Sequence, residues 1–370
     1  MATIGVVGLG TMGLGIAQVF AAAGFTTITT DAHAPARDTA RARMADALAA
    51  RVTAGKLSEA DRDATLSNLR AVETLSGFAP CDLVIEAIVE RADAKQALFA
   101  QLETIVSATT ILATNTSSIP VATIASTAQN PDRILALHFF NPPTAMKLVE
   151  LAPHAGTSAT ALATARTLTE AAGKTVIQCP DRPGFIVNRC ARPYYGEALA
   201  LLEEGIPAAH IDAAMQAAGY RLGPFALIDL IGADINLAAT LGLNAAMGNH
   251  PRYHAFAALR DQVAAGHLGR KSGQGFLFPA KTDPAPDPAI ALRIEATLVN
   301  EAAWLLTEGG TSAQGIDTAM KLGLNFPRGP FEALSQHGKS AILATLAALE
   351  SAAPPHLKTR YLPAPALEAL

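Results

Sequence analysis

Short runs rich in β-branched residues alternate with alanine-rich amphipathic segments over the first 180 residues. The strand-like runs fall at 4–8, 26–30, 83–87, 111–114, 133–139, 147–151 and 174–179, with a weaker run near 71–75. The helix-like segments fall mainly at 36–54, 91–106 and 159–172. Strands that alternate with helices predict an α/β domain of Rossmann type, built on a mostly parallel sheet.

The pattern changes after residues 181–184, where strand-like runs end and helical periodicity takes over. A proline-rich stretch at 279–288 has no apolar periodicity and predicts a linker. We therefore predict a nucleotide-binding domain and an all-α region of two parts, with the boundaries 1–182, 183–280 and 288–370.

The two helical parts resemble one another in sequence. Residues 197–205 (EALALLEEG) match 301–309 (EAAWLLTEG), and 211–232 match 316–338 with IDxAM and GPF in the same order. Arg252-Tyr253 is repeated as Arg360-Tyr361. These matches predict a tandem duplication. The second copy ends before any equivalent of GRKSG at 269–273, so we interpret it as degenerate.

Composition narrows the class of protein. The chain has 370 residues, of which 50% are hydrophobic and 16% charged, as expected of folded domains. A net charge of −4 gives no general attraction for nucleic acid or an anionic membrane. The apolar N-terminus lacks the basic residues of a signal peptide, and no apolar run reaches membrane-spanning length. Three scattered cysteines predict neither a metal site nor disulfides, and favour a reduced, cytoplasmic protein.

A glycine motif follows the first predicted strand directly and opens a helix: Gly8-Leu9-Gly10-Thr11-Met12-Gly13. The glycines permit a tight turn, close approach of a pyrophosphate, and helix–strand packing. Asp31 ends the second strand and is placed to accept hydrogen bonds from an adenosine ribose. This combination predicts NAD as the cofactor, although nearby Arg37 leaves NADP as an alternative. A plain turn, with Asp31 as a helix cap, is the structural alternative.

His138 ends one predicted strand and Glu150 lies in the next. If these strands form a hairpin centred near Thr144, the two residues face each other. A carboxylate on one imidazole nitrogen fixes the tautomer and makes the other nitrogen a better base. Oxidation of an alcohol requires such a base, although a single strand histidine can also be structural.

Longer motifs resemble the 3-hydroxyacyl-CoA dehydrogenase family, in the bacterial form with a duplicated helical unit that acts on 3-hydroxybutyryl-CoA or 3-hydroxyadipyl-CoA. They lie, in family order, at 8–24, 85–90, 115–118, 138–151, 181–189 and 269–276. The resemblance implies NAD-dependent oxidation of a 3-hydroxyacyl-CoA, in fatty-acid or aromatic-acid degradation or 3-hydroxybutyryl-CoA metabolism.

The resemblance also implies roles at matching positions. His138 resembles the general base, Glu150 its orienting acid, Ser117 a contact to substrate and nicotinamide, and Asn188 a contact to the substrate carbonyl. The positions that would line the cofactor are Glu90, Lys95, Asn115, Asn141 and Lys271. Structural alternatives remain: Ser117 and Asn188 as caps, Ser117 for a helix beginning near Ile119, and Lys95 as an exposed helix lysine.

Two departures from the family pattern concern substrate and assembly. A serine and a lysine that contact CoA in the family fall near Ala47 and Ala54, which leaves Arg51 and Lys56 as substitutes. Leu292 stands where the second copy would carry its equivalent of Asn188. Because single-copy relatives resemble dimers joined through the helical unit, the chain is expected to be a monomer with an internal pseudo-dimer, or a homodimer.

Two other functions fit part of the sequence. A β-hydroxyacid dehydrogenase of the 6-phosphogluconate type shares the glycine motif but requires a lysine that is missing from 184–189. A non-catalytic NAD-binding protein would not need His138, Glu150, Ser117 and Asn188 together.

Overall fold

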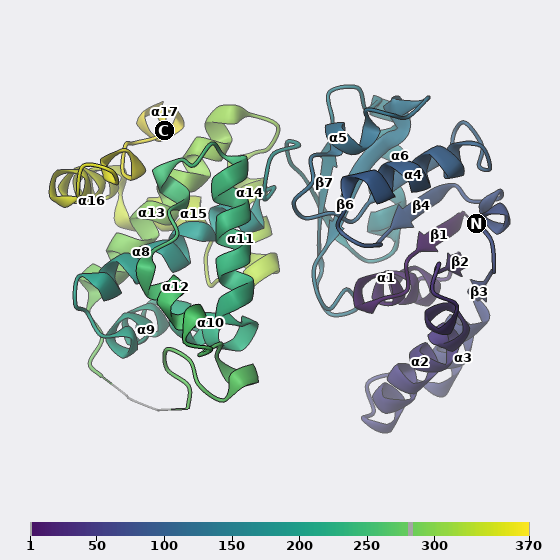
Figure 1. Ribbon diagram of the computed structural model, residues 1–370, viewed down its shortest axis with the longest axis horizontal. Coiled ribbons are helices and arrows are strands. Elements are labelled where there is room, and N and C mark those ends of the chain that lie inside the picture. Colours follow the sequence, from purple (N-terminus) through teal and green to yellow (C-terminus); the bar gives the residue numbers. More distant parts are fainter. Residues whose placement is uncertain (1, 280–283, 370) are drawn as a thin grey trace. The chain divides into compact units, whose positions relative to one another are not determined.

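The computed structural model describes residues 2–279 and 284–369. The chain divides into two compact units, with the boundary between Arg182 and Pro183 (Figure 1). The first unit is built on a sheet and the second is helical, which confirms the predicted fold class.

The sheet of the first unit has eight strands in the order β3-β2-β1-β4-β5-β6-β7-β8. All neighbouring strands are parallel except β6 and β7, which pair antiparallel. The mostly parallel sheet is as predicted. The strands are β1 Thr3–Val7, β2 Thr26–Thr30, β3 Leu69–Ala71, β4 Leu83–Glu86, β5 Ile111–Thr114, β6 Ile134–Phe139, β7 Leu148–Pro153 and β8 Thr175–Gln178.

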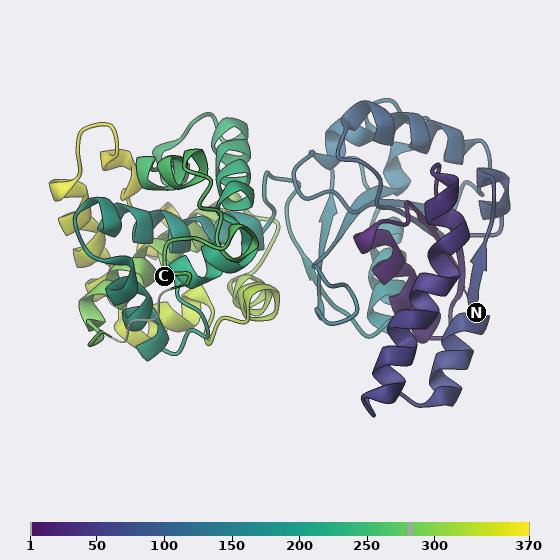
Figure 2. The ribbon, with the colours of Figure 1, turned by 60° about the horizontal axis from the view of Figure 1, so that its bottom comes forward.

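Apolar strand and helix residues form the core of this unit. Ile4 and Val6 of β1 and Leu83 and Ile85 of β4 are fully buried in one cluster with Phe20 of α1. Burial of this kind contributes roughly 25 cal/mol per Å² of apolar surface. The helices are α1 Thr11–Ala22, α2 Ala34–Thr53, α3 Glu59–Ser67, α4 Ala92–Glu103, α5 Val121–Ala125 and α6 Ala159–Ala171. Helices α2 and α3 lie side by side and project from the sheet (Figures 1 and 2).

The weak strand predicted near 71–75 was misplaced. Strand β3 ends at Ala71, and a short 3-10 helix occupies Leu75–Phe78. The chain leaves the sheet after Val72, whose carbonyl accepts a hydrogen bond from the Thr30 hydroxyl at 2.8 Å.

The helical unit repeats one sequence of elements. The first copy holds α7 Val187–Cys190, α8 Arg192–Glu203, α9 Ala208–Ala217, α10 Pro224–Ile231, α11 Ala233–Ala246 and α12 Ala257–Ala264. The second copy holds α13 Pro288–Glu308, α14 Ala313–Leu324, α15 Pro330–His337, α16 Lys339–Ala352 and α17 Pro365–Ala369. Of the predicted linker at 279–288, residues 280–283 lie outside the described residues.

The repeated sequence motifs make the same local structure in both copies. Asp212 accepts hydrogen bonds from the first helical N–H groups of α10, and Asp317 does the same for α15. A Cβ at Gly223 would lie 2.2 Å from Asp212, and one at Gly329 would lie 2.3 Å from Asp317. The shared IDxAM and GPF motifs therefore encode one device, a buried aspartate that caps the next helix across a glycine.

Glu197 of α8 lies in a charged cluster between the copies and is fully buried. Its carboxylate accepts hydrogen bonds from the Nε atoms of Arg293 at 2.8 Å and Arg360 at 3.2 Å, and from the Tyr361 hydroxyl at 3.2 Å. Arg293 also donates two bonds of 2.6 Å to Glu204. All three donors belong to the second copy. We call this the Glu197 cluster.

Glu301 of α13 lies in a second cluster, in which the second copy supplies the carboxylate and the first copy supplies the donors. Its carboxylate accepts from Arg189 at 2.7 Å, Arg252 at 2.9 Å and the Tyr253 hydroxyl at 2.6 Å. Arg189 also donates to Glu308, at 2.7 and 2.9 Å. In this Glu301 cluster the donors belong to the first copy. Each contact therefore has a reciprocal counterpart, as in the two-fold interface of a symmetric dimer.

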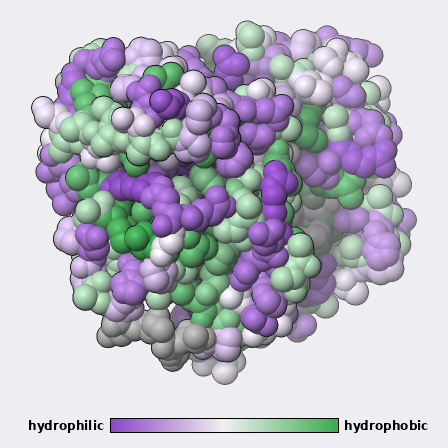
Figure 3. Space-filling model, turned by 60° about the vertical axis from the view of Figure 1, so that its left-hand side comes forward, coloured by the Kyte–Doolittle hydropathy of each residue, from purple (hydrophilic) through white to green (hydrophobic). Residues whose placement is uncertain are grey.

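Apolar residues are also exposed on the helical unit. Leu230, Ile231, Ile235 and Leu241 of α10 and α11 are each more than a third exposed, and Figure 3 shows hydrophobic areas bordered by hydrophilic ones on one face of this unit. Among the described residues, no single helix is long and apolar enough to cross a membrane. Helices α10 and α11 reach that length only as a pair bent by 102°.

Candidate active site

The glycine motif forms the turn between β1 and α1. Gly8 has φ of +93°, and a Cβ there would lie 2.6 Å from the carbonyl oxygen of Ala87. A Cβ at Gly13 would lie 1.7 Å from the carbonyl oxygen of Gly8. A Cβ at Gly10, in contrast, would meet nothing within 4 Å. The first and third glycines are thus required by the protein itself, whereas the second faces open space.

The N-terminus of α1 begins beside that open space. Thr11 and Met12 are its first residues, and the N-cap Gly10 supplies no side chain to bind the first N–H groups. A helix N-terminus with unsatisfied N–H groups and the positive end of the helix dipole binds phosphate. The residues present therefore fit the pyrophosphate of a dinucleotide.

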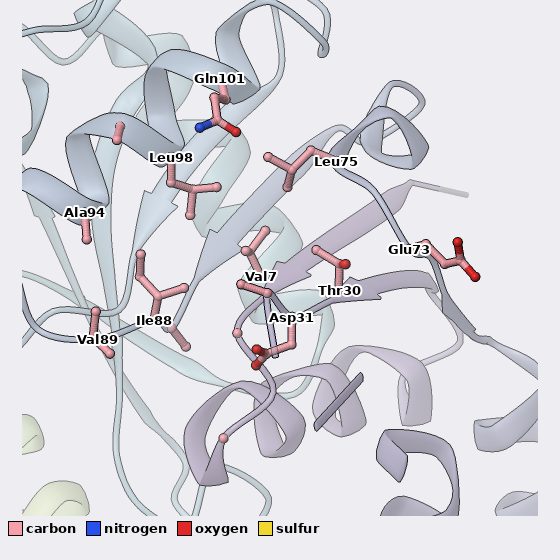
Figure 4. Close-up of a pocket in the computed structure, with 15 residues that line it drawn as sticks. Val7, Thr30, Asp31, Glu73, Leu75, Ile88, Val89, Ala94, Leu98 and Gln101 are labelled. Carbon is pink, nitrogen blue, oxygen red and sulfur yellow. The ribbon is translucent and has the colours of Figure 1, made fainter. Parts of the chain in front are cut away.

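A cavity of about 580 Å³ lies at the carboxyl ends of the parallel strands (Figure 4). Apolar residues such as Leu75, Ile88 and Leu98 line it, and its two ionisable lining residues are both acidic, Asp31 and Glu73. Figure 4 shows Asp31 at the glycine turn and Glu73 at the rim with its carboxylate directed outward. The lining therefore combines a mostly apolar surface with two acceptor carboxylates.

Asp31 also holds the backbone of the site. Its carboxylate accepts hydrogen bonds from the N–H groups of Leu9 at 2.6 Å and His33 at 2.7 Å. Arg37, which left NADP open, pairs with Asp38 at 3.1 Å and does not line the cavity. Sequence reasoning missed Glu73, because the position of β3 was misplaced. The signal available was its place shortly after β3, which is parallel to the strand that directly precedes Asp31.

His138 and Glu150 face each other across the antiparallel pair of β6 and β7. The predicted register is confirmed. His138 Nδ1 lies 2.7 Å from Glu150 Oε2, and Glu150 is fully buried while His138 is 7% exposed. The centroid of the Phe140 ring lies 4.7 Å from the centroid of the imidazole. A carboxylate this close fixes the orientation of the imidazole ring and, as the partner of Nδ1, selects the tautomer that leaves Nε2 free of a proton.

Two contacts hold the hairpin in place. Asn115 follows β5, and its Oδ1 accepts a hydrogen bond from the N–H of Phe139 at 2.8 Å. Gly15 of α1 lies against the turn of the hairpin, since a Cβ there would be 3.0 Å from Pro143. Asn141 precedes Pro142 in the same turn through a cis peptide bond. Helix α1, which begins in the glycine motif, therefore packs against the turn of the His138 hairpin.

Lys95 and Glu90 belong to a polar network beneath the loop after β4. The Lys95 side chain is 1% exposed, and its ammonium contacts Glu86 at 2.8 and 3.0 Å and Glu90 at 3.2 Å. Burial raises the pKa of Glu90, but hydrogen bonds from Thr116 and Ser118 and the charge of Lys95 outweigh it and hold that pKa below its usual value. The interpretation of Lys95 as an exposed helix lysine was wrong, because the ammonium is enclosed by carboxylates.

Ser117 lies half-buried in the loop after β5. The helix expected near Ile119 begins at Val121, and Asp181 caps it by accepting from the N–H groups of Val121 and Ala122 at 2.8 Å each. The capping alternative for Ser117 was therefore wrong.

Asn188 and Lys271 belong to the helical unit. Asn188 is half-buried in α7, where its backbone carbonyl oxygen accepts a hydrogen bond from Arg192 Nε at 3.1 Å. The Lys271 ammonium lies 2.5 Å from Asp234.

In the sheet unit, Arg51 lines a surface groove that does not include Lys56. No group of three or more possible metal ligands occurs among the described residues.

Comparison with known proteins identifies the chemistry. Residues 3–182 match the NAD-binding domain of 3-hydroxyacyl-CoA dehydrogenase. Residues 184–278 and 290–370 both match the C-terminal domain of the same enzyme. The chain is 34% identical to the 3-hydroxyadipyl-CoA dehydrogenase of Escherichia coli K12, over 94% of this chain and 93% of that protein.

Solved structures give the same result. The crystal structure of 3-hydroxybutyryl-CoA dehydrogenase from Escherichia coli K12 matches with a TM-score of 0.92 and 33% identity, over 100% of this chain and 98% of that one. The structure of (S)-3-hydroxybutyryl-CoA dehydrogenase from Ralstonia eutropha matches with a TM-score of 0.71 and 37% identity, over 98% of its own length but 75% of this chain. A quarter of this chain has no counterpart in that shorter enzyme.

Proposed function

This chain belongs to the 3-hydroxyacyl-CoA dehydrogenase family and is an NAD-dependent dehydrogenase, and we propose that His138 is its general base, held by Glu150. The observation that carries the proposal is the 2.7 Å contact between His138 Nδ1 and a fully buried Glu150 carboxylate. The alternative of a 6-phosphogluconate type enzyme is excluded by the family match over both units.

In the proposed reaction, the proton and the hydride leave the substrate alcohol in different directions. The glycine turn and Asp31 would hold NAD, which would supply the hydride acceptor for carbon 3 of the hydroxyacyl group. With Nδ1 donating to Glu150, Nε2 of His138 carries the basic lone pair and takes the hydroxyl proton. Glu150 stabilises the imidazolium that results. In the reverse direction, His138 returns the proton to the alkoxide oxygen.

The remaining site residues are proposed to bind and orient the ligands. Gly10 and the N-terminus of α1 hold the pyrophosphate, Gly8 and Gly13 form the tight turn that this requires, and Asp31 accepts from the ribose hydroxyls. Ser117 and Asn188 contact the substrate, and Asn141 and Lys271 complete the cofactor site. Asn115 acts by fixing the backbone after His138, and Lys95 acts through the conformation of Glu90.

The test of the base is kinetic. His138→Ala is expected to lower kcat by at least ~100-fold, the usual scale for losing acid–base catalysis. The assay follows NADH absorbance with acetoacetyl-CoA, and NADH binding, measured by fluorescence, is expected to survive. Glu150→Gln should slow turnover and shift the pH profile of kcat, because the imidazolium loses its charged partner. A His138→Ala enzyme with near-normal kcat would show that another group takes the proton.

The cofactor proposal is tested by discrimination between NAD and NADP. We expect kcat/KM to favour NAD more than tenfold, about 1.4 kcal/mol, because Asp31 and Glu73 repel a 2′-phosphate. Asp31→Ser should lower the ratio of kcat/KM for NAD to kcat/KM for NADP, and the double variant Asp31→Ser/Glu73→Gln should lower it further. Equal use of both cofactors by the wild type would contradict the assignment of Asp31.

Substrate, assembly and location are part of the same proposal. The similar proteins are named for 3-hydroxyadipyl-CoA and 3-hydroxybutyryl-CoA, and kcat/KM for both thioesters determines the preference of this enzyme. The Glu197 and Glu301 clusters favour an internal pseudo-dimer, so that the chain is a monomer or dimerises through another surface. The described cysteines are buried thiols, in keeping with a reduced cytoplasm.

A further inference from the structure

Arg192 is a buried cation that has no acidic partner. It begins α8, four residues after Asn188, and is 9% exposed. Its Nε donates to the backbone carbonyl oxygen of Asn188 at 3.1 Å, and Nη1 donates to the Thr240 hydroxyl at 3.1 Å. In the described part of the chain no carboxylate pairs with the guanidinium, and burial lowers its pKa. Burying an unpaired charge is costly, so packing alone does not account for this residue.

The other buried arginines of the helical unit are all neutralised. Among its described residues these are Arg189, Arg252 and Arg360, and each donates to a buried glutamate, either Glu301 or Glu197. Arg192 is the exception, because no charge of the protein compensates its own. Such a cation gains most from an anionic ligand, since the ligand supplies the missing charge where little water competes.

Asn236 of α11 is a second incompletely bonded group at the same place. It is 3% exposed, and its Oδ1 has no hydrogen-bond partner among the described residues. Its backbone carbonyl oxygen accepts from the Thr240 hydroxyl at 2.8 Å and lies 3.5 Å from Arg192 Nη1. Rotation of the side-chain amide would present its Nδ2 donors where the unused oxygen now lies. We call Arg192, Asn236 and Thr240 the Arg192 cluster.

The second helical copy fills the equivalent place with apolar residues. Counting from Glu197 and Glu301, and from the glycines that precede α11 and α16, pairs each member of the cluster with one residue. The pairs are Arg192 with Ala296, Asn236 with Ile342, and Thr240 with Leu346. All three counterparts are fully buried in one apolar cluster, against which Leu292, the counterpart of Asn188, also packs. Packing of a copy therefore does not require a charge here, and the polar cluster accompanies Asn188.

We propose that the Arg192 cluster binds a carboxylate at the far end of the acyl chain, so that the enzyme prefers dicarboxylic 3-hydroxyacyl-CoA thioesters. The inference rests on the proposed function, in which Asn188 contacts the substrate carbonyl. Because Arg192 bonds to the backbone of Asn188, a carboxylate on its guanidinium lies only a few carbon atoms from the reacting end. The guanidinium fork binds both oxygens of a carboxylate, and the Asn236 amide adds a further donor.

The experiment compares 3-hydroxyadipyl-CoA with 3-hydroxyhexanoyl-CoA, which has the same carbon chain but no distal carboxylate. The wild type is expected to favour the diacid at least tenfold in kcat/KM, mainly through KM. In Arg192→Met the ratio of the two kcat/KM values should fall at least tenfold, because the charged partner of the carboxylate is lost. Arg221→Met, which removes an exposed arginine of the same unit, is the matched control and should leave the ratio within about twofold.

A second variant separates binding from folding. Arg192→Ala/Asn236→Ile/Thr240→Leu gives the first copy the apolar residues of the second, and should keep the melting temperature of the wild type while losing the preference for the diacid. An equal loss of kcat/KM for both thioesters, with the ratio unchanged, would show that Arg192 only positions Asn188 and would overturn the proposal. So would a wild type that does not distinguish the two thioesters.

Binding without turnover keeps the two proposals apart. Calorimetry with the NADH-bound enzyme measures Kd for both thioesters, and we expect the diacid to bind at least tenfold more tightly in the wild type but not in Arg192→Met. Failure of the wild type to oxidise either thioester would contradict the proposed function, and the Kd values would still judge the cluster. Equal Kd values for the two thioesters in the wild type would refute the carboxylate site.

Discussion

The two helical copies differ in what they have kept. Both retain the aspartate that caps a helix across a glycine, and both retain a buried glutamate that receives two arginines and a tyrosine from the other copy. Only the first copy has the loop that carries Lys271, and only the first has an asparagine at its start, Asn188. Leu292 takes that place in α13 and packs against an apolar cluster of the second copy.

The comparison distinguishes residues that pair the two copies from residues proposed to contact the ligands. Contacts needed to pair the copies occur on both sides, because each side of a two-fold arrangement depends on the other. Residues proposed to meet the ligands occur once, because one catalytic unit is present. The second copy is thus explained by packing alone, and the first by packing and chemistry together.

The largest expected effect comes from removing the second copy. Deletion of 288–370 would uncover Arg189, Arg252 and Tyr253, which are buried against α13. Exposed faces of this kind drive association, so we expect self-association or aggregation and a lower melting temperature. Size-exclusion chromatography with light scattering on both proteins measures this. A truncated protein that stays monomeric, soluble and as heat-stable as the parent would refute the internal pseudo-dimer.

The second-largest effect is expected from substituting the buried glutamates one at a time, which tests whether the pairing of the copies is symmetric. Glu197→Gln and Glu301→Gln should each lower the free energy of unfolding by about 3 kcal/mol, because each leaves buried arginines without a charged partner. Urea denaturation measures both. Glu170→Gln, which breaks the exposed pair with Arg166, is the control and should cost below about 0.5 kcal/mol. A large loss in one cluster and none in the other would contradict the symmetric description.

The smallest effect tests whether the copies differ in function. Asn188→Leu, which gives the first copy the residue of the second, should lower kcat/KM about tenfold, the scale of one lost substrate hydrogen bond. Leu292→Asn should leave kcat/KM within about twofold of the wild type. Steady-state kinetics with acetoacetyl-CoA measure both. Equal sensitivity at the two positions would place the second copy in the active site.

Much of this arrangement was predictable from local pattern. The strand–glycine–helix start fixes the turn at Gly8 to Gly13, since a Cβ at Gly13 would collide with the backbone of Gly8. The spacing of His138 and Glu150 fixes their pairing, because a hairpin centred between them allows one register. The duplication was visible as repeated IDxAM and GPF motifs.

The rest depended on contacts between distant residues. Even the nearby partners of Lys95 depend on the fold, because Glu86 ends β4 and meets the α4 lysine only through the path of the loop between them. The cap of α5 comes from Asp181, sixty residues away, so local pattern favoured Ser117. The surface groove that Arg51 lines also includes Lys147 and Lys174, and only the fold brings these three positions together.

The reciprocal clusters also change how the interface can evolve. In a dimer of identical chains, every substitution in a two-fold interface appears twice, so its cost or benefit is doubled. Here Glu197 and Glu301 are separate codons, and a substitution at one leaves the other intact. Half of the interface can therefore drift or be repaired while the other half holds the copies together. A chain of this design can tolerate single changes that would dissociate a symmetric dimer. It can also accumulate differences between equivalent positions, such as Leu292 in the second copy and Asn188 in the first.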